Sequence, residues 1–123
     1  MRVADGGWLL LGVALNAAAQ LGLKAATRAT GVITVDGAGL WRSGLTLAAS
    51  TPFWLAICAY GVSVIVWTIG LSRVPVSQAY PVLSLGYVVT ALAAWIMLGE
   101  TITLTRWVGI GVIMAGVWLV VRS

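Results

Sequence analysis

Charged residues divide the chain into four long apolar blocks. Their bounds are 6–23, 43–72, 74–99 and 107–121. A helix needs about 20 predominantly apolar residues to cross the roughly 30 Å of hydrocarbon in a bilayer. The pattern therefore predicts an all-α membrane protein with four transmembrane helices, which form a single domain over residues 1–123. We expect these helices near 7–27, 52–72, 77–98 and 104–121.

The segment 28–51 is the only sizeable connection between the expected spans. Within it, Leu40, Trp41, Leu45 and Ala48 fall on one helical face, which is compatible with a short helix lying at the membrane interface. An irregular loop and an early start of the second span are equally compatible with this pattern. Pro52 suits the first turn of the second span, where a missing N–H costs nothing.

Composition supports the membrane assignment and narrows the chemistry. The chain is 61% hydrophobic and 8% charged, with a mean hydropathy of +1.06, one cysteine and no histidine. The sequence contains neither a clustered set of metal ligands nor a Ser/His/Asp arrangement, so we expect no enzymatic activity, no metal and no cofactor. The net charge of +4 suits lipid headgroups or an anionic lipid rather than a nucleic acid. The start of the chain lacks a signal-peptide cleavage pattern, so we expect the first span to be retained.

The distribution of cations gives the chain no clear membrane orientation. If the four spans alternate, one side of the membrane receives Arg2, Arg73 and Arg122, and the other receives Lys24, Arg28, Arg42 and Arg106. Three cations against four is no useful bias under the positive-inside rule. A subunit of four helices is also small for enclosing a transport path, so we expect a dimer, possibly an antiparallel one.

A polar stripe runs along the first span. Asn16, Gln20 and Lys24 follow each other at steps of four residues, which returns them to nearly the same helical face. Asn16 and Gln20 can bind a ligand, or they can serve as hydrogen-bonding contacts between helices. Lys24 can face a ligand, or its side chain can extend to the interface. A stripe that is neutral at mid-depth and cationic at one end suits a ligand with a polar head and a negative group.

Aromatic and hydroxyl side chains lie on matching faces of the next two spans. The candidates are Tyr60, Ser63 and Trp67 on the second span, and Tyr80, Ser84 and Tyr87 on the third. Rings with hydroxyls suit a sugar or a cation, and each of these residues is equally suited to ordinary helix packing. Pro81 is expected to loosen the first turns of the third span and to free backbone carbonyls beside the same cavity.

The fourth span is rich in small residues, which allow helix backbones to approach closely. These residues are Gly109, Gly111, Ala115 and Gly116. We therefore predict that this span contributes to dimerisation rather than to the wall of a pocket.

Residues 73–120 resemble the second half of small multidrug resistance-type transporters of the drug/metabolite transporter superfamily. The resemblance rests on "VPVSQAYPVLSL" at 74–85, "LGE" at 98–100 and "RWVGIGVIMAGV" at 106–117, and "AQLGLKAA" at 19–26 matches the first helix. It implies dimers of four-helix subunits, often antiparallel. In such dimers the first three helices line the substrate path and the fourth helices mediate dimerisation.

Two branches of that group differ at Asn16. Proton-coupled drug exporters carry a membrane-embedded glutamate eight residues before the lysine that matches Lys24, and an amide cannot exchange protons for cations. "AYPVLSLGYV" and "AQLGLK" are most similar to subunits that flip 4-amino-4-deoxyarabinose linked to undecaprenyl phosphate across the bacterial inner membrane. This resemblance implies a phosphate that meets Lys24 or Arg28, and a sugar that is hydrogen-bonded along the way.

These inferences predict a multi-pass inner-membrane subunit that moves a polyprenyl-phosphate-linked aminosugar or a related lipid, as a homodimer or with a similar subunit. Two alternatives stay open. One is an exporter of small cations, such as polyamines or quaternary amines, whose partner subunit supplies the missing carboxylate. The other is a subunit that transports nothing and anchors or stabilises a membrane enzyme.

Overall fold

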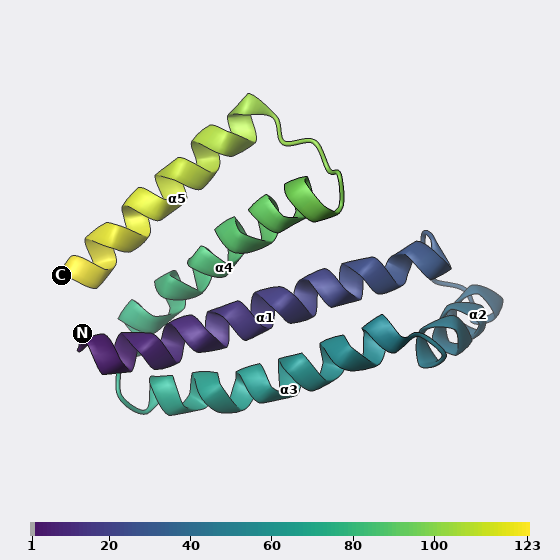
Figure 1. Cartoon of the computed structure of the whole chain (residues 1–123), viewed down its shortest axis with the longest axis horizontal. Helices are drawn as coiled ribbons and strands as arrows, with labels where there is room; N and C mark the ends of the chain where they lie inside the picture. Colours follow the sequence, from purple (N-terminus) through teal and green to yellow (C-terminus); the bar gives the residue numbers. More distant parts are fainter. Residues whose placement is uncertain (1) are drawn as a thin grey trace.

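The computed structural model describes residues 2–123, and all of the regular secondary structure in that range is α-helical. Its helices are α1 (Val3–Thr30), α2 (Gly37–Ala48), α3 (Thr51–Leu71), α4 (Val76–Met97) and α5 (Leu104–Arg122). All of them except α2 are long and apolar enough to span a bilayer. The prediction of four spanning helices is therefore confirmed, and the protein is a multi-pass membrane protein. Figure 1 shows α1 between α3 and α4, with both chain termini at one end of the molecule.

α1 is longer at both ends than the sequence pattern indicated. It begins at Val3 rather than near residue 7 and ends at Thr30 rather than near residue 27. Charges of favourable sign extend it, because Asp5 lies in the first turn and Arg28 in the last turn, where they complement the helix dipole. Gly31 then ends the helix with a positive φ of 64°, a conformation that glycine adopts without a steric penalty.

α2 is a separate helix and not an early start of α3. The Asp36 carboxylate accepts a hydrogen bond from the backbone N–H of Gly39 and so caps the start of α2. The Ser50 hydroxyl caps α3 by accepting from the N–H of Phe53, and Pro52 lies in the first turn as expected. Two side-chain caps therefore define two helix starts. The outer surface of α2 exposes Leu40, Trp41 and Leu45.

We expect this face of α2 to contact the membrane interface. An environment-sensitive fluorophore on a cysteine at position 41, in a Cys58→Ser background, is expected to be quenched by brominated lipids. The same label on an Arg42→Cys variant is expected to be quenched at most half as strongly, because the side of an interfacial helix that carries a basic residue faces the headgroups. Equal quenching at both positions would contradict an interfacial orientation of α2.

Small residues bring α1 and α3 into close contact. A Cβ atom added at Gly12 would lie 3.3 Å from the backbone Cα and N of Trp67, and one added at Gly22 would lie 2.9 Å from the Cβ of Ala56. Such close approach is the usual function of glycine and alanine between membrane helices. These contacts make the α1–α3 pair the most closely packed part of the molecule.

The buried core lies at the end that carries the two termini. It comprises Leu9, Val13, Val74, Ala79, Val82 and Val117. The ion pair between Arg73 and Asp5, 3.9 Å apart, lies at the same end. Figure 1 shows α4 diverging from α1 toward the opposite end. The subunit is therefore packed at one end and splayed at the other, which leaves open space along α4.

Candidate functional site

Two adjoining cavities lie along α4. The larger, of about 430 Å³, is formed by α1 and α4 with Ile113 of α5, and the smaller, of about 200 Å³, is formed by α1, α3 and α4. Asn16, Tyr80 and Leu83 line both cavities. These shared residues make the two cavities neighbouring parts of one polar path inside the subunit.

Eight of the ten predicted ligand-binding residues line these two cavities. The larger cavity takes Asn16, Gln20, Tyr80, Ser84 and Tyr87, and the smaller takes Asn16, Tyr60, Ser63, Trp67 and Tyr80. Helical spacing accounts for this grouping, because the predicted residues of α1, of α3 and of α4 each lie on one face of their helix. The structure therefore brings the three predicted faces together. Ligand binding by these residues stays a prediction.

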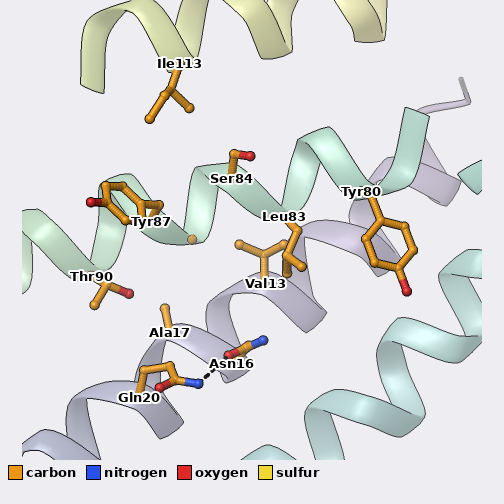
Figure 2. Close-up of a pocket in the computed structure, with 11 residues that line it drawn as sticks. Val13, Asn16, Ala17, Gln20, Tyr80, Leu83, Ser84, Tyr87, Thr90 and Ile113 are labelled. Atoms are coloured by element: carbon orange, nitrogen blue, oxygen red, sulfur yellow. Dashed lines mark hydrogen bonds between the residues drawn. The ribbon is translucent and has the colours of Figure 1, made fainter. Parts of the chain in front are cut away.

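Asn16 and Gln20 are the polar residues on the α1 side of the larger cavity, beside Val13 and Ala17. The Nε2 of Gln20 donates to the Oδ1 of Asn16 over 3.5 Å, a long hydrogen bond. Figure 2 shows this pair side by side on α1, on the side of α4 to which Thr90 points, whereas Ser84 points to the other side of α4, toward Ile113 of α5. An amide has two donor hydrogens and an acceptor oxygen. The pair therefore keeps hydrogen-bonding capacity for a ligand.

Aromatic packing shapes the smaller cavity. The rings of Trp67 and Tyr80 meet edge to face, with centroids 5.9 Å apart and an interplanar angle of 87°. Tyr80 remains 52% exposed, so its hydroxyl can reach a ligand. Ser63 differs, because it is only 3% exposed and its Oγ donates to the Tyr60 carbonyl over 2.6 Å. The hydroxyl proton of Ser63 is therefore already engaged within α3.

The two predicted cations lie outside the lining of both cavities. Lys24 is exposed one turn beyond Gln20, and Arg28 is exposed one turn further along α1. The guanidinium of Arg28 donates through Nη2 to the carbonyl oxygen of Leu98 over 3.3 Å. Arg28 therefore connects the end of α1 to the end of α4. Neither cavity lining contains a charged side chain.

A third cavity, of about 470 Å³, lies between α4 and α5 and was not predicted from the sequence. Glu100 and Arg106 line it, and Thr90 lines both this cavity and the larger of the other two. Thr90 follows Tyr87 by three residues on the same face of α4, so helical spacing alone could have identified it. Glu100 lies in the α4–α5 connection and Arg106 in the first turn of α5, so no helical periodicity relates them.

The small residues of α5 do not share a single face. Gly109 lines the third cavity, whereas Gly111 and Ala115 project to the side away from the buried Ile110 and Val117. All four predicted dimerisation residues are exposed, and a Cβ added at Gly109, Gly111 or Gly116 would meet no atom within 4 Å. The outer side of α5 is therefore open in the subunit, and dimerisation through it stays a prediction.

Comparison with known proteins identifies relatives of this chain. It is 34% identical over 112 residues to the probable 4-amino-4-deoxy-L-arabinose-phosphoundecaprenol flippase subunit ArnE of Pseudomonas fluorescens strain Pf0-1, covering 90% of this chain and 91% of that protein. The protein of the same name from Yersinia pestis strain Pestoides F is 41% identical over 68 residues, covering 54% and 60%. That from Pseudomonas syringae pv. syringae is 32% identical over 85 residues, covering 68% and 79%.

No solved structure matches the chain significantly. The family model of EamA-like transporters matches residues 29–122, from the end of α1 through α5. The match therefore includes the residues of α3 that line the smaller cavity. It also includes the face of α4 that lines all three cavities. This chain belongs to the EamA-like transporter family.

Proposed function

We propose that this chain is one subunit of a flippase that moves a polyprenyl-phosphate-linked aminosugar across the bacterial inner membrane. The observation that carries the proposal is the uncharged polar lining of the two adjoining cavities at the middle of the subunit. The names of the relatives, which are flippase subunits for such a lipid-linked sugar, support the same substrate class.

The cavity lining suits the sugar part of such a substrate. A pentose presents hydroxyl groups that both donate and accept hydrogen bonds. The amides of Asn16 and Gln20 and the hydroxyls of Tyr80 and Ser84 can do the same. Tyrosine rings add apolar faces on which a sugar ring can lie. Such a lining replaces part of the water that the sugar loses on entering the membrane, and this lowers the cost of its transfer.

The lipid part does not need to enter the cavities. The outer surface of the spans exposes large apolar side chains, such as Ile65, Ile96 and Leu119, which suit contact with lipid. The polyprenyl chain can therefore stay in the bilayer while the head crosses along α4. Lys24 and Arg28, at the end where α4 diverges from α1, would attract the phosphate on approach.

A second subunit would complete the path. The larger cavity and the third cavity both have residues of α4 and α5 in their linings, and Gly111 and Ala115 are exposed on the outer side of α5. A similar or identical partner that packs on α5 would convert the open side into an enclosed passage. The printed names of the relatives describe subunits, which supports an assembly of this kind.

The exporter alternative requires a carboxylate where a cation would bind. The linings of the two adjoining cavities consist of apolar residues with amides, hydroxyls and aromatic rings. A quaternary cation in such a site would lose its hydration without gaining an opposite charge or a hydrogen bond, whereas the hydroxyls of a sugar gain hydrogen bonds there. The composition of these linings therefore favours the sugar-linked lipid over a small cation.

Ligand binding by the purified protein tests this proposal. Native mass spectrometry with undecaprenyl phosphate aminoarabinose is expected to show retention of the lipid by the wild type. Gln20→Ala is expected to weaken retention about tenfold, because a sugar hydroxyl left without a partner costs about 1–3 kcal/mol. Lys24→Ala is expected to weaken it less, since Lys24 lies outside the cavities. Leu11→Ala, on the exposed side of α1, is the control and should have no effect.

Other outcomes would contradict the proposal in recognisable ways. Retention of tetraphenylphosphonium in place of the lipid, unaffected by Gln20→Ala, would support the cation exporter. Retention of neither ligand, together with stable co-purification of a membrane enzyme, would support the non-transporting subunit.

A further inference from the structure

Two opposite charges face the third cavity, the space of about 470 Å³ between α4 and α5. Glu100 belongs to the α4–α5 connection, and Arg106 lies in the first turn of α5. Both line the cavity, together with Thr90 and Thr101 and with apolar residues of α4 and α5. Of the three cavities described above, this one therefore combines an acidic with a basic side chain.

The two charges do not form an ion pair with each other. Across residues 2–123, the one ion pair within 4.0 Å is that of Arg73 with Asp5, at the opposite end of the subunit. Glu100 and Arg106 thus share a cavity while each keeps its charge available. A carboxylate and a guanidinium that face one space without pairing suit a ligand that carries a positive and a negative group.

Backbone interactions position both residues. The N–H of Glu100 donates to the carbonyl oxygen of Ala94 over 3.1 Å, and Gly99 makes the turn before it with a φ of 69°. The Thr103 hydroxyl caps α5 by accepting from the N–H of Arg106 over 3.3 Å. The turn at Gly99 and the cap at Thr103 therefore fix the backbone of the two charged residues beside the third cavity.

The third cavity continues the path through the other two. It shares Tyr87, Thr90 and Ile113 with the larger cavity, and Figure 2 shows these three residues at one end of that cavity, with Tyr80 at the other. From Tyr80 to Ala94 the lining face of α4 rises about 21 Å, at 1.5 Å per residue. That is about two-thirds of the thickness of the hydrocarbon, so the face crosses most of the membrane.

We propose that this third cavity is a binding site for a zwitterionic sugar head group, in which Glu100 binds the amine and Arg106 binds the phosphate. The site rests on the proposed function, and it adds recognition of the free amine, which the uncharged cavities cannot supply. An ammonium next to a carboxylate and a phosphodiester next to a guanidinium form charge-assisted hydrogen bonds. The sugar would then move between this site and the other two cavities along the hydroxyl groups of α4, from Tyr80 to Thr90.

Comparison of two substrates tests the site. Retention of undecaprenyl phosphate aminoarabinose is compared with that of its N-acetylated form, which keeps the sugar, phosphate and lipid but has no charge on nitrogen. The wild type is expected to prefer the free amine about tenfold. Glu100→Gln is expected to reduce this preference to less than twofold, whereas Arg106→Gln is expected to weaken retention of both lipids alike. Thr101→Val, which changes an uncharged residue of the same cavity, should preserve the preference.

The possible results separate this inference from the proposed function. If the wild type retains both lipids equally, or if Glu100→Gln keeps the preference, the head-group site is wrong while the flippase proposal stands. If the wild type retains neither lipid, both are wrong. Gln20→Ala serves as a further reference, because it should weaken both lipids without changing their ratio. Elution of each variant at the wild-type volume in size-exclusion chromatography excludes misfolding as the cause of a lost preference.

Discussion

Replacement of Gly12, which lines the smaller cavity, by leucine is expected to destabilise the subunit more than any other single change in the cavities. The added side chain would begin 3.3 Å from the backbone Cα and N of Trp67, and a backbone cannot move aside as a flexible side chain can. Overpacking typically costs about 1–3 kcal/mol. Here it would also separate α1 from α3, the pair that supplies two walls of the smaller cavity.

The measurement is the SDS-induced unfolding of the purified protein in mixed micelles, followed by far-UV circular dichroism. Gly12→Leu is expected to lower the SDS fraction at the midpoint, or to prevent the accumulation of folded protein. Gly61→Leu is the matched control on α3, since a Cβ at Gly61 meets no atom within 4 Å. A Gly12 variant as stable as the Gly61 variant would contradict the close α1–α3 packing.

Replacement of Asn16 by leucine is expected to give the largest loss of transport. Asn16 is the polar residue of α1 that lines both adjoining cavities, and leucine has a similar size but no hydrogen-bonding group. A sugar hydroxyl left without a partner costs about 1–3 kcal/mol. The rate of translocation is therefore expected to fall about tenfold or more, because 1.4 kcal/mol corresponds to a factor of ten.

Translocation is measured in proteoliposomes from the accessibility of the aminosugar to a membrane-impermeant amine reagent. Ala14→Leu is the control, because Ala14 is exposed on the side of α1 opposite Asn16. The two variants should be equally stable in SDS, since Asn16 donates to or accepts from no group except Gln20 among the described residues. An Asn16→Leu protein that transports at the rate of Ala14→Leu would place the sugar path elsewhere.

Several features of the site could be predicted from sequence because they are local. A run of apolar residues determines whether a segment can span a membrane, and the 3.6-residue period determines which side chains share a face. The stripe of Asn16 and Gln20 on α1 and the face of Tyr80, Ser84 and Tyr87 on α4 are properties of single helices. Their appearance in the cavity linings follows from the tendency of polar membrane residues to face the protein interior.

Features that depend on contacts between helices required the tertiary structure. The sequence predicts a cation at the end of the α1 stripe, but Lys24 lies outside the cavities. The Arg28 side chain instead donates to the carbonyl oxygen of Leu98, although α4 diverges from α1 toward this end. In the same way, the bond from the Ser63 Oγ to the Tyr60 carbonyl is local to α3, but the 3% exposure of Ser63 depends on how closely α3 packs against its neighbours. Burial of this kind is a property of neighbouring helices and not of the residue itself.

The sequence by itself therefore determined the number of spans, their polar faces and the absence of an embedded acid at Asn16. Only the tertiary structure decided that three cavities follow one face of α4 and that Glu100 and Arg106 face the same one. The physical reason is that span formation depends on the transfer of each segment into lipid, residue by residue. Cavities, by contrast, depend on the angles at which helices cross. Small residues such as Gly12 and Gly22 allow α1 and α3 to pack closely, while α4 diverges from α1.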